Sequence, residues 1–579
     1  MAFQLHKPIR GMSRFFKTAT LLCVAAVMVV FLAACGGSGS GNTSSSRPLV
    51  VVTAPGQYNV DFFNPFNSAN QGSDWGAQGL LYEELYFTST LDGSTHPWLA
   101  TSYQYSDNNS VLTFHLRSGV NWNDGKPLTS ADVVYTFNLM KQYPDLDHNA
   151  LWTNLIKSVS APDDSTVVFT LQHPDSTALF YIGDGVFIVP QHIWSNLIAG
   201  VTPDKYQNDD HPVGTGPYEL SSFNSDLIVY TANPHYWGGE PAVKEIEVPA
   251  VKDNTTAVQD MAAGQYDWTS TGWSGQYSSI FEGKNPSVNH VWFAASNTVM
   301  LYLNLTKAPF NNLNFRKAVN AAIDRSQLPQ GVAQYAPVAN PTGVKTTFVS
   351  KWVAPQYQNL QYPSGQNLVD QYMKAAGFVK NGSYYQYANG QPFSMSVDVV
   401  NGWSDWDQDV QFIVNDLNKA GIKASVNSES GYTPYYTAIS TGQYDAAISW
   451  TDNGPTPYYA YHDLLESSLA ATKTSPAGGS NFESWDAATS GGLSNQTDAL
   501  LKQYTSSTDP NVQLQAIEGI ETIMVNDLPV LPLTVNPYWD EYTTAHFTGW
   551  PDASNPYALG ADTTMPDAAY VILHLKPVS

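Results

Sequence analysis

A strand–helix–strand pattern between residues 393 and 426 places the strongest restriction on how this chain can fold. Phe393–Val399 alternates apolar and polar residues at period two, which predicts a strand. A turn at Asn401–Trp403 follows, and Ser404 can cap a helix that has Asp407 three residues further on. The helix carries an apolar stripe, stops at Gly421 and leads into a second strand. Such a unit joins parallel strands through a helix, so the sequence predicts the α/β class.

Two tryptophans, Trp403 and Trp406, stand where the first of these strands runs into its helix. Ligands of α/β sheets bind beyond the carboxyl ends of the strands, at junctions of this kind. For a single tryptophan, packing in the core is the more common role. Both residues are therefore candidate ligand contacts, with core packing as the alternative for each.

A short motif occurs twice in the chain, as Gly264–Asp267 and again as Gly442–Asp445, both reading Gly-Gln-Tyr-Asp. In each copy a helix is expected to stop at the glycine and a strand to follow. The first strand leads to Thr269–Trp273 and the second to Trp450–Gly454. Two α/β units with equivalent loops suggest two lobes that face each other across a cleft. The alternative is chance recurrence of a common turn.

The first 34 residues are typical of a bacterial lipoprotein signal peptide. Positive residues precede an apolar stretch over 21–34, which is too short to span a bilayer comfortably. The stretch ends directly before Cys35, in a sequence that resembles a lipobox, so Cys35 is the predicted lipidation site. Residues 35–47 are rich in Gly and Ser and predict a flexible tether. An ordinary secretory signal with an incidental cysteine is the alternative.

The charge and cysteine content exclude several classes of protein. The formal net charge is −24, from 26 Lys+Arg and 50 Asp+Glu, which argues against binding to nucleic acid or to an anionic membrane surface. Both cysteines, Cys23 and Cys35, fall in the leader or at its end, so the secreted body has no thiol for a disulfide or a metal. The chain is also rich in aromatics, with 16 Trp and 34 Tyr, some of them in predicted loops.

Several motifs in chain order resemble the bacterial extracellular solute-binding proteins of family 5, the oligopeptide, dipeptide and nickel-binding class of ABC importers. The strongest is Leu116–Val133 (LRSGVNWNDGKPLTSADV), which resembles the signature of that family. On its own terms this stretch predicts a strand, a tight turn at Asn123–Gly125 and a helix capped by Thr129 and Asp132. The further matches are Gly214–Tyr218, Asn233–Gly238, Asn304–Phe310, Arg316–Ala318, Ala322–Arg325 and Leu528–Leu533.

The resemblance implies a fold like that of periplasmic binding proteins of the cluster C type, with two lobes, a hinge and an inserted third domain. Lobe I would comprise residues 48–85, 206–300 and 525–579, and lobe II residues 301–524. The inserted domain would comprise residues 86–205. Two crossover strands near Val299–Leu305 and Val530–Val535 would form the hinge. The implied role is capture of a solute outside the cell by hinge closure, and its delivery to an ABC permease in the cytoplasmic membrane.

Peptide-binding members of the family pair the ligand's α-amine with an aspartate in a loop that Trp450–Pro457 resembles. Asp452 is the matching acid, and Trp450, Asn453 and Tyr458 lie beside it in the sequence. A buried ammonium needs a fixed carboxylate partner, and removing one partner costs about 3–5 kcal/mol. The alternative for Asp452 is a turn-capping role next to Asn453 and Gly454.

The sequence also departs from the peptide-binding pattern. Thr456 stands where peptide binders often have an acid before proline. Some family members bind cello-oligosaccharides or related sugars through aromatic platforms, and Trp403, Trp406 and Trp273 flank the predicted cleft loops. Peptides are the first expectation for the ligand and oligosaccharides the second.

No enzyme class fits the sequence as well as solute binding does. Motifs of metalloproteases, serine hydrolases and phosphate-binding loops are missing from the sequence, and its adjacent acid pairs suit a solvated surface. A secreted glycoside hydrolase is the remote alternative. No cofactor and no metal are expected, because the histidines are scattered, and this also disfavours nickel or haem as ligand. The predicted protein is monomeric and bound to the outer face of the cytoplasmic membrane through its lipid alone.

Overall fold

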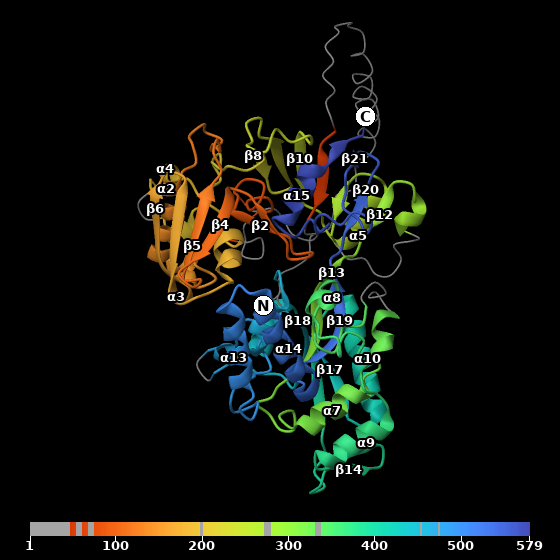
Figure 1. The fold of residues 1–579 in the computed structure, drawn as a ribbon. Helices are drawn as coiled ribbons and strands as arrows, with labels where there is room; N and C mark the ends of the chain where they lie inside the picture. The colour runs from red at the N-terminus through yellow and green to blue at the C-terminus, as the bar shows by residue number, and fades with distance from the viewer. Residues whose placement is uncertain are drawn as a thin grey trace, which may run out of the picture. The chain divides into compact units, whose positions relative to one another are not determined.

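The α/β class predicted from the sequence is confirmed by a computed structural model with three main sheets (Figure 1). It describes residues 47–53, 61–67, 74–196, 201–270, 280–330, 337–451, 454–472 and 475–578. Arg47–Ser579 forms one compact unit. Within the described ranges, no helix has both the length and the apolar character that a membrane crossing would need.

The first sheet has seven strands drawn from distant parts of the chain. Its central strand β1 (Leu49–Val52) pairs in parallel with β10 and β11, and the remaining pairings are antiparallel. In sheet order the strands are β12 (Asn289–Val291), β20 (Glu541–Thr543), β11 (Trp268–Thr269), β1, β10 (Glu245–Pro249), β9 (Leu227–Ala232) and β8 (Tyr218–Asn224).

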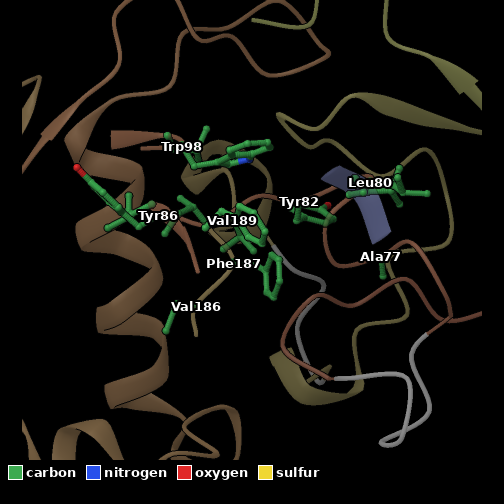
Figure 2. Packing of buried hydrophobic residues seen from close by; sticks show 14 of the residues in the cluster. Ala77, Leu80, Tyr82, Tyr86, Trp98, Val186, Phe187 and Val189 are labelled. Carbon is green, nitrogen blue, oxygen red and sulfur yellow. The ribbon is translucent and has the colours of Figure 1, made fainter. Parts of the chain in front are cut away.

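The second sheet is four-stranded and antiparallel, and one of its faces is exposed. Its strands in order are β4 (Ala100–Ser106), β5 (Val111–Leu116), β7 (Thr166–Leu171) and β6 (Ile156–Asp163). Helix α2 (Ser130–Gln142) begins with the predicted capping box, in which Asp132 accepts a hydrogen bond from the Thr129 backbone at 2.9 Å. The first two sheets share one continuous core. Figure 2 shows part of it, with side chains from residues 77–98 beside those from residues 186–189.

The third sheet has five strands and is covered on both faces. Its strands in order are β17 (Ala424–Glu429), β16 (Met395–Val400), β18 (Ala446–Trp450), β13 (Ala295–Leu303) and β19 (Leu531–Pro537). Strand β13 sends Val299, Leu301 and Leu303 into one core, and Met300 and Tyr302 into the other. A strand buried on both sides in this way needs apolar residues at consecutive positions.

Helices cover the two faces of the third sheet. One core is completed by α7 (Leu313–Ala322), α9 (Gln366–Ala375) and α10 (Ser404–Ala420). The other is completed by α11 (Tyr432–Ser440), α12 (Pro457–Leu465), α13 (Ser494–Thr505) and α14 (Pro510–Asp527). The remaining helices include α3 (Leu151–Asn154), α4 (Gln191–Trp194), α5 (Asn254–Ala262), α8 (Val349–Trp352) and α15 (Asp567–His574).

Three two-stranded sheets lie outside the main sheets, and the first two of them are hairpins. They pair β2 (Tyr86–Thr88) with β3 (Thr95–Pro97), β14 (Phe378–Asn381) with β15 (Tyr384–Tyr387), and β21 (Phe547–Thr548) with β22 (Lys576–Pro577). The turn 89–94 joins the two strands of the first hairpin. The Thr90 carbonyl in this turn accepts a hydrogen bond of 2.7 Å from Lys345 Nζ, which links the hairpin to the segment 343–348.

The predicted strand–helix–strand unit is present, with small shifts at its ends. The strands are β16 and β17, which pair in parallel, and α10 joins them and ends at Gly421 with φ of 93°. The sequence predicted Ser404 as the cap, but the helix already includes Ser404 and Trp403 is the N-cap residue. The Asp407 carboxylate accepts a hydrogen bond from the Gly402 backbone at 3.0 Å instead, which ties the turn to the helix.

The repeated Gly-Gln-Tyr-Asp motif has the same structural role in both copies. Helices α5 and α11 end just before Gly264 and Gly442, and β11 and β18 follow. Asp267 then accepts a hydrogen bond from Val50 in the neighbouring strand β1, at 3.0 Å. Asp445 accepts one from Ser396 beside it in β16, at 3.3 Å. The match in contacts shows that the repetition is structural and not a coincidence of turns.

Candidate functional site

The candidate site lies at the carboxyl edge of the five-stranded sheet. Strands β16, β17 and β18 run parallel to one another, so the chain leaves all three at the same edge. A helix follows each of them: α10 after β16, α11 after β17 and α12 after β18. This is the edge at which α/β sheets bind ligands.

Three aromatic rings from these three junctions form an aromatic shelf, made of Trp403, Tyr432 and Trp450. The Trp403 ring is stacked on Trp450 at 5.5 Å and 16°, and on Tyr432 at 5.6 Å and 17°. Tyr432 and Trp450 are also near parallel, with centroids 6.2 Å apart. Tyr432 is 44% exposed, and the two tryptophans are half-buried. Near-parallel, accessible rings of this kind offer apolar area to a ligand at small entropic cost.

Local sequence explains how the shelf is held. Gly402 adopts φ of 92°, a left-handed conformation that glycine tolerates best, and this turn places Trp403 in extended backbone before α10. Trp406, one turn into the helix, is 3% exposed and packs against Trp403 and Trp450 at 5.2 and 5.0 Å. Trp406 therefore supports the shelf from below.

A small cavity of about 20 Å³ lies at the same edge, directly after Trp450 in the sequence. It is bounded by the start of the crossover strand β13, by the segment 343–348 and by the start of α12. Its lining residues are Asn297, Thr298, Gly343, Val344, Lys345, Phe348, Thr451, Gly454, Thr456, Pro457, Ala460 and Tyr461.

The polar groups of the cavity differ in how many hydrogen bonds they make with the described residues. Thr298 is fully engaged, because its hydroxyl donates to the Gly343 carbonyl at 2.8 Å and its N–H donates to Thr451 Oγ1 at 3.3 Å. The Asn297 Oδ1 atom is buried and has no hydrogen-bond partner among the described residues. Lys345 is 7% exposed, and its burial lowers the pKa of its ammonium to about 8. The cavity thus presents an unused acceptor and a poorly solvated cation.

The structure places the predicted site residues in three groups. Trp403 and Trp450 lie together in the aromatic shelf, and Trp406 lies beneath it. Tyr458 is 5% exposed and stacks on Tyr504 at 4.6 Å within the core, and it does not line the cavity. The predictions for Asp452, Asn453, Trp273 and Cys35 lie outside the described residues.

The sequence interpretation missed three residues that the structure brings to the site. Tyr432 follows β17 as Trp403 follows β16, so the same reading of strand-to-helix junctions could have found it. Asn297 and Lys345 come from segments that carry no recognisable motif, and only the packing of β13 against the segment 343–348 brings them together. Among the residues that the structure describes, no group of His, Cys, Asp or Glu is arranged to hold a metal ion.

Comparisons with known proteins agree on one family. The model of the bacterial extracellular solute-binding proteins, family 5, matches residues 94–471. Among curated proteins, heme-binding protein A of Haemophilus influenzae is 25% identical over 547 residues, which cover 89% of this chain and 93% of that protein.

Solved structures show the same fold. A periplasmic oligopeptide-binding protein of an oligopeptide ABC transporter from Thermotoga maritima aligns over 92% of this chain and all of its own, with a TM-score of 0.81 and 23% identity. A mannohexaose-bound structure of an oligopeptide-binding protein from that organism aligns over 93% of this chain and 99% of its own, with a TM-score of 0.74 and 24% identity. At this identity the likeness establishes the fold, and the ligands of those proteins are not assigned to this chain.

Proposed function

The chain belongs to the bacterial extracellular solute-binding proteins of family 5, and from this premise we propose that it captures peptides outside the cell and passes them unchanged to an ABC permease. The observation that carries the proposal is the aromatic shelf at the carboxyl edge of the five-stranded sheet, where the loop after β18 also lines a cavity. Accessible rings at an edge that also presents amide, hydroxyl and ammonium groups suit a ligand that has both apolar and hydrogen-bonding parts.

Capture requires the molecule to open and close around the ligand. We assign residues 48–85, 206–300 and 525–579 to lobe I, 86–205 to an inserted domain and 301–524 to lobe II. Strands β13 and β19 pair with each other, and we propose that the two chain crossings near them form the hinge. Ligand binding shifts the equilibrium toward the closed state by as much as the ligand prefers that state.

We propose that the ligand is bound without chemical conversion. The support for this part of the proposal is membership of the chain in a family of solute-binding proteins. A chromogenic oligosaccharide that is turned over by the purified chain would overturn the non-catalytic role.

We further propose that the protein is exported, lipidated on Cys35 and active as a monomer at the outer face of the cytoplasmic membrane. The leader of residues 1–34 and the tether of residues 35–47 support this part of the proposal. Mass spectrometry of the amino-terminal peptide from the membrane fraction tests it, because a diacylglyceryl group on Cys35 has a distinct mass. An unmodified peptide that begins elsewhere would overturn the anchor.

Oligosaccharides are the second candidate ligand, and the aromatic shelf is the observation that favours them. A pyranose ring stacks its apolar face on aromatic rings and offers its hydroxyl groups to polar side chains. Peptides keep first place because Asp452, next to the cavity in sequence, matches the acid that binds the α-amine in peptide-binding relatives.

A thermal-shift screen of di- to pentapeptides against cello-, xylo- and malto-oligosaccharides tests the proposal. A ligand at a hundredfold its dissociation constant stabilises the folded chain by about 2.7 kcal/mol, which is readily measured. The variant Asp452→Ala then separates the two candidates. It should abolish binding of a peptide, since an unpaired buried ammonium costs about 3–5 kcal/mol, and it should weaken binding of a neutral sugar only slightly.

A further inference from the structure

Lys345 is a buried cation in the wall of the candidate cavity. It belongs to the segment between the isolated bridge at Val338 and the short 3₁₀ helix Thr346–Phe348. The side chain is 7% exposed, and its Nζ lies 4.2 Å from the centre of the Phe348 ring. Lys345 is also one of the residues that line the cavity.

The turn 89–94, between β2 and β3, contacts Lys345. Lys345 Nζ donates a hydrogen bond of 2.7 Å to the Thr90 carbonyl. Thr90 is itself held by Asp567 of α15, which accepts from the Thr90 hydroxyl at 3.0 Å and from its N–H at 3.4 Å. The same turn touches the loop after β18, because a Cβ placed on Gly93 would come within 2.0 Å of the Pro455 carbonyl.

The hydrogen bonding of Lys345 is incomplete. An ammonium carries three N–H donors. Among the described residues the Thr90 carbonyl is its one acceptor, and no carboxylate forms an ion pair with it. Burying a charge with so few partners is unfavourable. The lowered pKa of Lys345 has the same cause, since burial outweighs the more distant carboxylates of Asp567 and Asp92.

We propose that Lys345 couples ligand binding to closure of the two lobes. Closure brings the turn 89–94 against Lys345 and buries its ammonium, and an oxygen acceptor of the ligand in the cavity then supplies a further hydrogen-bond partner. The inference rests on the proposed capture function and names one feature of the ligand, a carboxylate or another oxygen acceptor directed at Lys345. A carboxylate would satisfy the ammonium best, because charge-assisted hydrogen bonds are the stronger ones. Lys345 is thus a positioning residue that disfavours closure around an empty cavity.

The proposal is testable without any ligand. Two nitroxide labels report the distance between lobe I and lobe II. They are attached at exposed positions, through Ser225→Cys in the β8–β9 turn and Ala388→Cys beyond β15. The full chain with Cys23→Ser and Cys35→Ser has no other thiol. The ligand-free Lys345→Met variant should raise the ratio of closed to open molecules by at least about tenfold, because closure no longer buries a charge.

The matched control is Lys351→Met. Lys351 also lies over an aromatic ring, that of Trp352 at 5.5 Å, but it is exposed. This variant should leave the distance distribution unchanged. The proposal is wrong if Lys345→Met leaves the distribution unchanged, because Lys345 then has no influence on closure. It is also wrong if the variant shifts the distribution toward the open state, because Lys345 then stabilises the closed state. Circular dichroism of both variants confirms that each is folded.

The pH profile gives a second readout that packing alone would not produce. The Lys345 pKa is about 8 when buried and near its ordinary value of 10.5 when exposed, so closure releases a proton between these values and is favoured as pH rises. Of the groups that face it, Asp567 has a pKa of about 6 and stays ionised in this range, and Tyr461 of α12 has its pKa raised well above the range. Asp92 lies in the facing turn.

Raising the pH from 7 to 10 should therefore close the ligand-free chain but leave Lys345→Met unaffected. An equal response in both proteins would overturn the proposal. The outcome is independent of the ligand screen. If the chain binds none of the tested peptides or sugars, the proposed function is wrong. If it binds one of them but Lys345→Met has no effect on closure, only the role of Lys345 is wrong.

Discussion

Two clusters of aromatic residues in this protein differ in how their polar groups are used. The first, the Glu83 cluster, consists of Trp98, Tyr236 and Trp237 around the Glu83 carboxylate. Glu83 accepts from Trp98 Nε1 at 2.8 Å, from the Tyr236 hydroxyl at 2.8 Å and from Trp237 Nε1 at 3.0 Å. The second is the aromatic shelf. There the indole N–H groups make no hydrogen bond with the described residues, and the rings are partly exposed.

Ring geometry separates the two clusters in the same way. Trp98 and Trp237 meet edge to face at 89°, which is how rings interlock in a core. Trp403 and Trp450 lie 16° from parallel and are both partly exposed. The difference shows that a count of tryptophans does not locate a binding site. Satisfied donors and crossed, buried rings mark a structural cluster, whereas near-parallel rings that stay partly exposed mark one that is available to a ligand.

The largest effect expected from this comparison is on stability, at Glu83. The variant Glu83→Ala leaves three donors without an acceptor in a buried site, at about 1–3 kcal/mol each, so the free energy of unfolding should fall by about 5 kcal/mol. Urea titration followed by tryptophan fluorescence measures it. The matched variant Glu83→Gln keeps an acceptor and should lose less than half as much. If Glu83→Ala unfolds like the parent, the cluster does not have the structural role assigned to it.

Glu83 should also make the stability of the protein depend on pH. Burial raises the pKa of Glu83 to about 7, from an ordinary value of 4.5. The unfolded chain therefore releases this proton first, and the contribution of Glu83 to stability is present below about pH 4.5 and lost as pH rises to 7. The loss should amount to about 3 kcal/mol. Urea midpoints at pH 5 and 7.5 should differ in the parent and differ less in Glu83→Gln.

Other buried carboxyls also lower the stability as pH rises. The free energy of unfolding of the parent chain should therefore fall more steeply with pH than Glu83 alone would cause. Burial raises the pKa of Asp562 and of Glu521 to about 8, and that of Asp398 to about 6. A parent chain that is more stable at pH 7.5 than at pH 5 would contradict this account of its buried acids.

The smallest expected effect concerns ligand affinity at the shelf. The variant Trp403→Ala should weaken binding of whichever ligand the screen identifies by about 2 kcal/mol, or roughly 30-fold, because a central aromatic contact is lost. Its stability should change less than that of Glu83→Ala, since Trp403 is only half-buried. Isothermal titration calorimetry measures the affinity. The control is Trp152→Ala, another half-buried tryptophan that is far from the five-stranded sheet in the sequence and should leave affinity unchanged.

Local sequence was sufficient for the elements that depend on near neighbours. The capping box of Thr129 and Asp132, the end of α10 at Gly421 and the strand on each side of that helix followed from spacing alone. The same reading placed Trp403 at the edge of the sheet, because the position of a strand-to-helix junction is a local property. Its error of one residue at the start of α10 arose because Asp407 bonds to Gly402 and not to Ser404.

Tertiary structure alone decided which aromatic rings stay accessible in the shelf and which charged group lies in the cavity wall. Trp406 and Tyr458 are as aromatic as Trp403, yet packing buries the first under the shelf and the second against Tyr504. Lys345 acquires a carbonyl acceptor from Thr90, 255 residues earlier in the chain. The periodicity of apolar residues specifies elements and the faces they bury, but the burial of a particular charge depends on which distant segments meet around it.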